Sequence, residues 1–203
     1  GYNHLMGNLM DSHDQVRIMA FLDGDLTLSD DGTRRAWQEP PITVDNPLTY
    51  RKELVFLGYI LTVPGIPVID YGDEFGLTGA NDPDNRRMMR FGEELSDLER
   101  EQLQQVSNLI QLRNMHPALR RGDYLPLKAE KDIFIYSRGD ANERLIIALN
   151  KSPDIQNPII FLPDWLRGQS LRSLTNNNTW PIDYNTVKVS LAGYSVDIFT
   201  INP

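Results

Sequence analysis

The chain has 203 residues, of which 40% are hydrophobic and 24% charged, a composition typical of a globular protein with one large or two small domains. It contains no cysteine, which excludes disulfides and thiol catalysis but leaves the cellular compartment open. The formal net charge of -8 argues against a nucleic-acid or anionic-membrane partner, and no apolar run approaches the roughly 18 residues of a membrane span.

The first predicted element is a short buried strand that ends in a group of polar residues. The apolar run Leu5–Met10 is followed directly by Asp11, Ser12, His13 and Asp14. In a barrel of parallel strands, residues just past the C-terminal end of a strand lie at the catalytic face. A carboxylate there can stabilise a developing positive charge while the imidazole binds a hydroxyl. A hydrogen-bonded turn is the alternative use of the same residues.

A polar connection follows the first strand. Residues Met19–Leu22 favour a short helical turn, and Asp23–Gly32 is an acidic loop rich in turn residues. Aspartates at alternating positions could offer oxygen ligands to a structural Ca²⁺, but their spacing does not match the calcium-loop pattern. We therefore expect a solvated loop here, no metal ligands and no cofactor.

A helix and a second strand come next. Asn46-Pro47 predicts the helix start, with asparagine as N-cap and proline in the first helical position, and the helix continues to Leu61. One face should pack on a sheet: Leu54, Leu57, Gly58 and Leu61. The segment Val63–Gly76 is a second buried strand running into an acidic, glycine-punctuated loop. Strand, helix and strand in this order are typical of a parallel sheet, so the two acidic strand ends should form one site.

A longer helix follows. Ser96 and Glu99 form a capping box, in which the hydroxyl and the carboxylate each satisfy a free amide, and the helix should end near His116, before Pro117. One apolar stripe of this helix should be buried: Leu103, Val106 and Ile110, with Leu109 and Leu112 beside it.

The periodicity changes after Gly122. Short strand candidates, separated by turn residues and not by helices, predict an antiparallel sandwich. They are Ile133–Tyr136, Leu145–Leu149, Ile159–Leu162, Val187–Leu191 and Val196–Ile201. We place the domain boundary near Asp123, which divides the chain into residues 1–122 and 123–203.

Four motifs in this order resemble the C-terminal part of a glycoside hydrolase of the α-amylase superfamily, nearest to its neopullulanase- and cyclomaltodextrinase-like members. They are LMDSHD at 9–14, GIPVIDYGDE at 65–74, DPDNRRMMRF at 82–91 and LIQLRNMHPAL at 109–119. The resemblance extends from about Asn3 to Tyr124. Family members commonly have asparagine where this chain has Ser12, and serine is frequent in the neopullulanase-like branch.

The resemblance implies an α/β fold followed by an all-β one. Residues 1–122 would be the last two β/α units of a (β/α)8 barrel, strands 7 and 8 with their helices, and residues 123–203 an antiparallel β-sandwich C-terminal domain. A closed barrel of this type takes about 250 residues. The family's nucleophile and acid/base belong to the fourth and fifth strands, which would lie upstream of Gly1. We therefore expect a fragment that is inactive alone.

The resemblance also implies roles for individual residues. Asp14 matches the third acidic residue, which contacts sugar hydroxyls and stabilises the transition state, and His13 would donate to a hydroxyl of the same sugar. Arg17 matches an arginine that pairs with acidic groups around the site. Arg86 and Asn85 match a loop that contacts the first sugar, so these three residues are also counted as substrate-binding.

The implied function is that of a retaining α-glucan hydrolase, acting on α-1,4 bonds of starch, maltooligosaccharides or cyclodextrins. The expected partners are an α-glucan or oligosaccharide substrate, the N-terminal barrel region, and another copy of the chain through exposed strand edges. Two other readings stay open. One is a non-catalytic carbohydrate-binding or structural relative on the same scaffold. The other is an antiparallel binding module with an unrelated helical lead-in. The sequence does not distinguish periplasmic, secreted and cytoplasmic locations.

Overall fold

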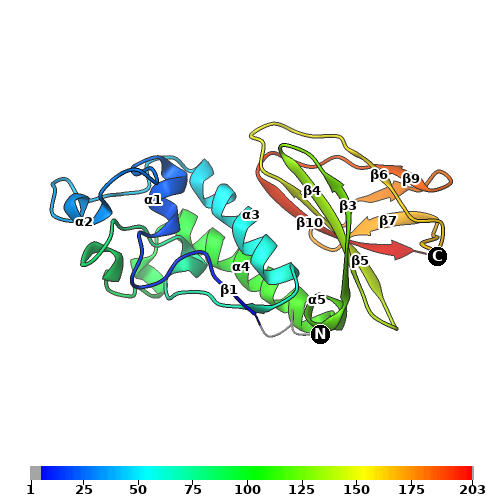
Figure 1. Cartoon of the computed structure of the whole chain (residues 1–203), viewed down its shortest axis with the longest axis horizontal. Coiled ribbons are helices and arrows are strands. Elements are labelled where there is room, and N and C mark those ends of the chain that lie inside the picture. Colours follow the sequence, from blue (N-terminus) through cyan, green and yellow to red (C-terminus); the bar gives the residue numbers. More distant parts are fainter. Residues whose placement is uncertain (1–5, 203) are drawn as a thin grey trace.

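The computed structural model describes residues 6–202, so Leu5 of the first predicted strand lies outside the described residues. Figure 1 shows a helical part on one side and a sheet-rich part on the other, with α3 lying between them. None of the helices within residues 6–202 combines the length and the hydropathy of a membrane-spanning segment.

The helical part contains a small parallel sheet. Its elements in chain order are β1 (Gly7–Asn8), α1 (Ile18–Asp23), α2 (Gly32–Arg35), α3 (Leu48–Thr62), β2 (Ile66–Pro67), three 3-10 turns (Asp73–Phe75, Asp84–Arg86, Gly92–Glu94), α4 (Asp97–Met115) and α5 (Pro117–Arg121). β1 and β2 pair in parallel, as predicted. The predicted length and burial of both strands are wrong: each has two residues, and Met6, Leu9 and Ile66 are exposed. Within residues 6–202, β1 and β2 pair only with each other, so no further strand lies at the outer edge of either one.

The predicted start of α3 is confirmed to within two residues. The Asn46 side-chain oxygen accepts the N–H of Leu48 at 3.0 Å, and Pro47 has helical backbone angles. Helix α3 packs against α4 and against strand β10 (Ser195–Asn202) of the sheet-rich part. Gly58 lies in close contact with β10, since a Cβ added there would lie 2.8–2.9 Å from three side-chain carbons of Val196. Glycine at this position therefore lets the helix reach the sheet.

Gly58→Ala is expected to lower the free energy of unfolding by about 1–2 kcal/mol, because the added methyl group overpacks the contact with Val196. The clash should outweigh the roughly 1 kcal/mol that alanine gains over glycine in a helix. Urea denaturation of the single variant and of Gly58→Ala/Val196→Ala measures the effect. The second substitution should recover part of the loss, and a Gly58→Ala protein more stable than the parent would contradict the packing argument.

Helix α4 begins and ends where the sequence predicts. Ser96 and Glu99 form the capping box, and His116 follows the last helical turn. The buried stripe differs in part: Val106 and Leu109 are buried, whereas Leu103 is 37% exposed. Polar residues of α4 are buried in its place, and each has a partner. Gln102 donates to Glu53 at 2.8 Å, and Arg113 donates to backbone carbonyls.

The sheet-rich part is antiparallel throughout. Its larger sheet has six strands in the spatial order β3 (Asp123–Ala129), β4 (Ile133–Gly139), β5 (Arg144–Asn150), β10, β7 (Ser170–Ser173) and β8 (Thr179–Pro181). The strands β6 (Ile159–Phe161) and β9 (Thr186–Lys188) pair separately. All five predicted strands are present, and β3, β7 and β8 were not predicted.

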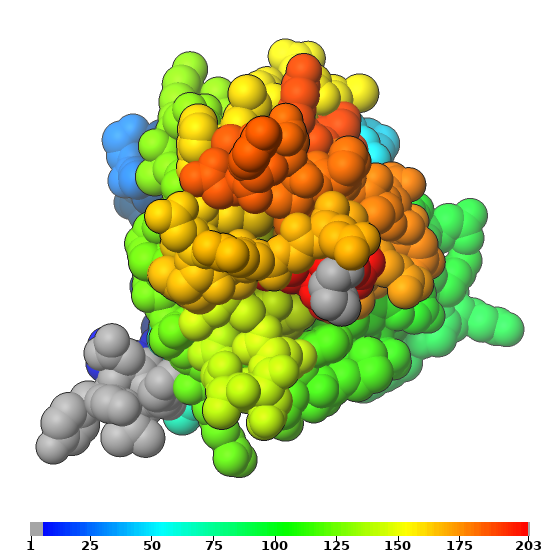
Figure 2. All heavy atoms as spheres, turned by 90° about the vertical axis from the view of Figure 1, so that its right-hand side faces the viewer, coloured from blue at the N-terminus to red at the C-terminus, as the bar shows by residue number. Residues whose placement is uncertain are grey.

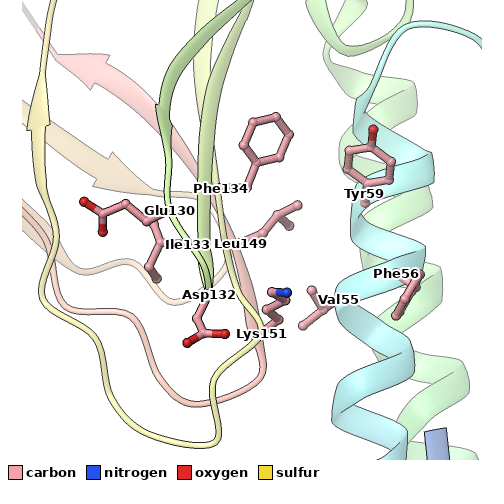
Figure 3. A pocket seen from close by; sticks show the side chains of 9 residues that line it. All are labelled: Val55, Phe56, Tyr59, Glu130, Asp132, Ile133, Phe134, Leu149 and Lys151. Carbon is pink, nitrogen blue, oxygen red and sulfur yellow. The ribbon is translucent and has the colours of Figure 1, made fainter.

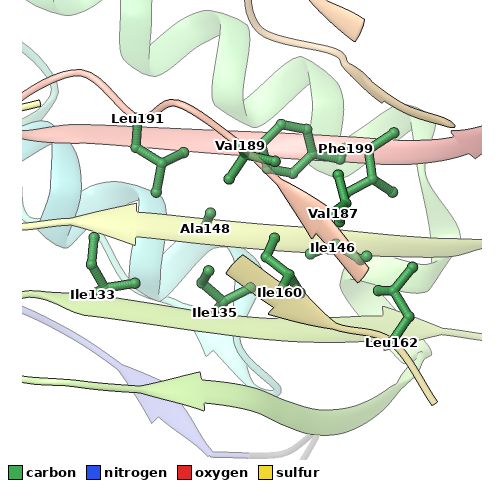
Figure 4. Packing of buried hydrophobic residues seen from close by; sticks show 11 residues of the cluster. Ile133, Ile135, Ile146, Ala148, Ile160, Leu162, Val187, Val189, Leu191 and Phe199 are labelled. Atoms are coloured by element: carbon green, nitrogen blue, oxygen red, sulfur yellow. The ribbon is translucent and has the colours of Figure 1, made fainter. Parts of the chain in front are cut away.

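Two apolar clusters cover the two faces of the larger sheet. Between it and β6–β9 lie Ile135, Ile146, Ile160, Val187 and Phe199 with their neighbours, as Figure 4 shows. On the other face Tyr136, Ile147 and Ile198 pack against residues of α3, α4 and α5, among them Leu61, Leu109 and Leu119. The sheet is therefore a middle layer, with helices on one side and two short strands on the other.

Two buried arginines join these layers through backbone carbonyls. Arg113 of α4 donates to the carbonyls of Leu61 at 2.6 Å, Leu119 at 2.9 Å and Gly65 at 2.9 Å. Arg138 of β4 donates to the carbonyls of Thr62, Gly122 and Asp123. Burial lowers the pKa of both side chains, that of Arg138 to about 10. The last carbonyls of α3 are thus bonded from two other elements.

Candidate functional site

A buried arginine connects the loops that leave the ends of β1 and β2. Arg17 is 0% exposed, and its Nη1 lies 3.1 Å from Asp70 Oδ2 and 3.2 Å from Asp73 Oδ1. Its Nε donates to the carbonyl of Asn85 at 2.9 Å, and the Tyr71 ring stacks on the guanidinium, 4.6 Å from its central carbon. The two strand ends therefore share one site, as the sequence predicts.

The same arginine lies near a third carboxylate. Asp11 is buried, its Oδ2 accepts the N–H of Ile18 at 2.6 Å, and its Oδ1 is 3.8 Å from Arg17 Nη1. Burial and the repulsion from the Asp11 carboxylate raise the pKa of Asp73 to about 8. Burial also raises the pKa of Asp11. Burial and the charge of Asp73 likewise hold the pKa of Glu53, on α3, well above its usual range. One guanidinium does not balance these acids, so the cluster retains protons at neutral pH.

Stability is expected to fall as pH rises from about 4 to about 8. Asp73 keeps its proton in the folded chain up to about pH 8, whereas the unfolded chain releases it near pH 4, so the folded state binds more protons across that window. One such proton gives a slope of about 1.4 kcal/mol per pH unit. Urea denaturation at pH 5 to 8 measures this slope. Asp73→Asn, which imitates the protonated form, should flatten it, and an unchanged slope in that variant would exclude Asp73 as the source.

The loop after β1 is held in place by Asn85. The side-chain amide of this fully buried residue donates to the carbonyls of His13 and Gln15, both at 2.8 Å. The 3-10 turn Asp84–Arg86, which contains Asn85, thus fixes the backbone on both sides of Asp14.

Three exposed polar side chains come together at this point, two from the loop after β1 and one from the turn that contains Asn85. Arg86 Nη2 is 3.3 Å from Asp14 Oδ1, and His13 Nε2 is 3.5 Å from Asp14 Oδ2. Arg86 Nε also donates to the His13 carbonyl at 3.1 Å. The side chains of Asp14 and His13 are 71% and 64% exposed. The group offers a carboxylate, an imidazole and a guanidinium to a polar ligand, and hydroxyl groups of a sugar fit these donors and acceptors.

The structure brings all five predicted site residues together but gives them different surroundings. Asp14, His13 and Arg86 face solvent. Arg17 and Asn85 are fully buried and bonded to protein atoms, so the prediction that they contact substrate does not agree with their burial. Asp11 and Asp70 follow the two strands that were expected to share a site, but neither was named as a site residue. The arginine three residues after Asp14 was the available signal, since it needs carboxylates to pair with.

Three carboxylates of the acidic loop Asp23–Gly32, those of Asp23, Asp30 and Asp31, accept hydrogen bonds within the protein. Asp23 accepts the N–H groups of Asp45 and Asn46, and Asp30 accepts the N–H of Thr27. Among residues 6–202, no group of three or more His, Cys, Asp or Glu side chains could hold a metal ion.

A separate pocket of about 190 Å³ opens between α3 and the β4–β5 hairpin. Figure 3 shows Val55 and Tyr59 on the helix side and Phe134 and Leu149 on the strand side, with Lys151 and Asp132 near one end. None of the five predicted site residues lines it. Its apolar walls distinguish it from the polar group at Asp14.

Comparisons with known proteins find similarity to a cyclomaltodextrinase and to α-amylases. No protein-family model matches the chain. It is 31% identical to a cyclomaltodextrinase of Geobacillus thermopakistaniensis over 98% of this chain and 29% of the relative. An α-amylase of Geobacillus thermoleovorans, solved with acarbose, superposes with a TM-score of 0.79 at 25% identity, over 100% of this chain and 41% of that protein. An Anoxybacillus α-amylase superposes with a TM-score of 0.78 at 27% identity, over 98% and 38%. The chain therefore spans less than half the length of each.

Proposed function

From the premise that the chain is a homologue of the α-amylase family of glycoside hydrolases, we propose that it is the C-terminal part of a retaining α-glucan hydrolase. The parent enzyme would cleave α-1,4 bonds of starch, maltooligosaccharides or cyclodextrins. In this proposal β1, α3, β2 and α4 are the last two units of a (β/α)8 barrel, and the sheet-rich part is a C-terminal β-sandwich. The parallel pairing of β1 with β2, with α3 between them, supports the first assignment.

The observation that carries the proposal is the exposed carboxylate of Asp14, held between Arg86 and His13 at the end of β1. Glycoside cleavage passes through a transition state with oxocarbenium character. Asp14 would accept hydrogen bonds from sugar hydroxyls that strengthen as the ring distorts, and its charge would stabilise the positive charge on the ring. The nucleophile and the acid/base would come from the part of the parent enzyme that precedes these residues.

The other residues divide into two roles in this proposal. His13 would donate to a hydroxyl of the same sugar, and Arg86 would orient Asp14 and bind a neighbouring hydroxyl. Arg17 and Asn85 are positioning residues: the first joins the loops after β1 and β2, and the second fixes the backbone on both sides of Asp14. The partner of β1 and β2 would be the preceding barrel region, with association of two copies as the outcome when that region is missing.

The 203-residue chain alone is expected to show no hydrolysis of soluble starch or β-cyclodextrin, because Asp14 neither attacks the anomeric carbon nor protonates the leaving oxygen. The same residues joined to the preceding barrel segment of their parent gene should release reducing sugar. Turnover by the isolated chain that Asp14→Asn abolishes would refute the assignment. A complete parent that binds maltooligosaccharides without cleaving them would instead identify a non-catalytic relative.

A further inference from the structure

A tight hairpin turn at the far end of the sheet-rich part holds a tyrosine in an unfavourable backbone conformation. Asp183 and Thr186 exchange two backbone hydrogen bonds of 2.8 and 2.9 Å, so Tyr184 and Asn185 form a two-residue loop. Tyr184 has a φ of 55°, a value that favours glycine and is rare for an aromatic residue. Its side chain is 100% exposed, so it contributes no packing that would offset this strain.

The turn forms one wall of a groove of about 600 Å³. The opposite wall is the loop 163–168, which is tied to the hairpin by the Leu162 N–H to Asn185 carbonyl bond of 2.7 Å. The lining includes three hydrogen-bonding side chains of different kinds, those of Asp164, Arg167 and Asn185. Figure 2 views this end of the molecule, where the gold and orange segments of residues 160–190 make up much of the surface.

The strand beside the groove also exposes apolar side chains. On β6, Ile160 is buried against the larger sheet, while Ile159 and Phe161 point to the other side and are exposed. Phe161 pairs in register with Thr186, the residue that closes the Tyr184 turn. This surface therefore offers hydrogen bonds from the groove and apolar contacts from the aromatic rings beside it, a combination that is characteristic of binding sites.

We propose that this groove binds an α-glucan chain, with Tyr184 as its stacking platform; the proposal rests on the function proposed above. A glucose ring has an apolar face of C–H groups, which can lie against the tyrosine ring, and a rim of hydroxyls. The planar fork of Arg167 donates to such hydroxyls, the carboxylate of Asp164 accepts from them, and the amide of Asn185 does both. One cation and one anion leave the groove without a strong net charge, which suits a neutral polymer.

The groove is separate from the Asp14 group. None of its lining residues belongs to the loops after β1 and β2, and Figure 1 places β6 and β9 at the opposite end of the molecule from α1 and α2. A glucan held there would anchor the protein on a polymer without occupying the Asp14 site.

The test is affinity electrophoresis of the 203-residue chain through gels containing amylopectin, with hydroxyethylcellulose gels as the β-linked reference, and titration with maltoheptaose. The chain should be retarded by amylopectin only. Tyr184→Gly should weaken retardation about tenfold or more, without lowering the melting temperature, because glycine suits a φ of 55°. Tyr184→Phe, which keeps the ring, should retain binding.

Asp14→Asn separates this proposal from the function proposed above. Binding that Tyr184→Gly abolishes and Asp14→Asn leaves intact supports the groove. Binding that only Asp14→Asn abolishes overturns the groove proposal and supports the Asp14 site. Equal retardation by both polymers, or by neither, also overturns the groove proposal, and hydrolysis by the complete parent would then decide the function on its own.

Discussion

Asp14→Asn in the complete parent enzyme is expected to lower kcat about hundredfold or more, the loss typical of removing one preorganised electrostatic contact to a transition state. Asparagine keeps the size and one hydrogen-bond acceptor of the side chain but not its charge. The melting temperature should not change, because Asp14 is exposed and its contact with Arg86 is a surface ion pair. Steady-state kinetics with maltotetraose and a thermal melt of the same preparation measure both quantities.

Asp97→Asn is the matched control for this substitution. Asp97 is also an exposed carboxylate paired with an arginine, Arg100, but it lies in the first turn of α4. The control should keep kcat close to that of the parent enzyme. A decrease of less than about threefold in Asp14→Asn, against the hundredfold expected of such a contact, would remove Asp14 from the chemistry.

Arg17→Met is expected to lower the free energy of unfolding by about 3–5 kcal/mol, the usual cost of leaving buried charges without their partner. The substitution keeps the apolar stem and removes the only cation within salt-bridge distance of Asp11, Asp70 and Asp73 among the described residues. It also removes the bond to the Asn85 carbonyl, so the loops after β1 and β2 lose their connection. Urea denaturation of the chain at pH 7 measures the loss.

Two further variants make this result interpretable. Arg86→Met removes an exposed arginine from the same site and should cost only about 0–1 kcal/mol. Arg17→Met/Asp70→Asn also removes the carboxylate nearest to Arg17 Nη1, at 3.1 Å, and should recover part of the stability. If the double variant is no more stable than Arg17→Met, the loss comes from packing and not from charge.

Local signals in the sequence predicted helix ends well. The capping box of Ser96 and Glu99 and the Asn46-Pro47 pair act over three or four residues, so no knowledge of the rest of the fold is needed. Burial within α4 was harder to predict. Gln102 displaces Leu103 from the buried face because Glu53, 49 positions earlier, provides its hydrogen-bond partner.

Strands, too, were predicted correctly where the local sequence pattern is strong and missed where it is weak. β4 and β5 are continuous apolar runs and were predicted. β3 contains Pro126 and a bulge, and β7 alternates a single leucine with polar residues, so neither has a strong pattern. β1 and β2 were predicted too long because an apolar run shows that burial is favourable but not which neighbours are present.

The sequence predicts which segments form the site, but not how the side chains in it are buried and paired. The position of Asp14 and His13 at a strand end follows from their order in the chain. The burial of Arg17 does not, because its partners Asp70, Asp73 and Asn85 come from segments more than 50 residues away. The same holds for Asn85, whose role depends on the carbonyls of His13 and Gln15.

The two buried arginines have a consequence for how the molecule comes apart. Arg113 and Arg138 both bond the end of α3, one from α4 and the other from β4, and neither has a carboxylate partner within hydrogen-bond distance among residues 6–202. If the helices opened while the sheet stayed folded, Arg138 would lose the Thr62 carbonyl, and the apolar side chains on that face of the sheet, among them Tyr136, Ile147 and Ile198, would be exposed to water. Opening either part breaks these contacts, so we expect the helices and the sheet to unfold in a single cooperative transition.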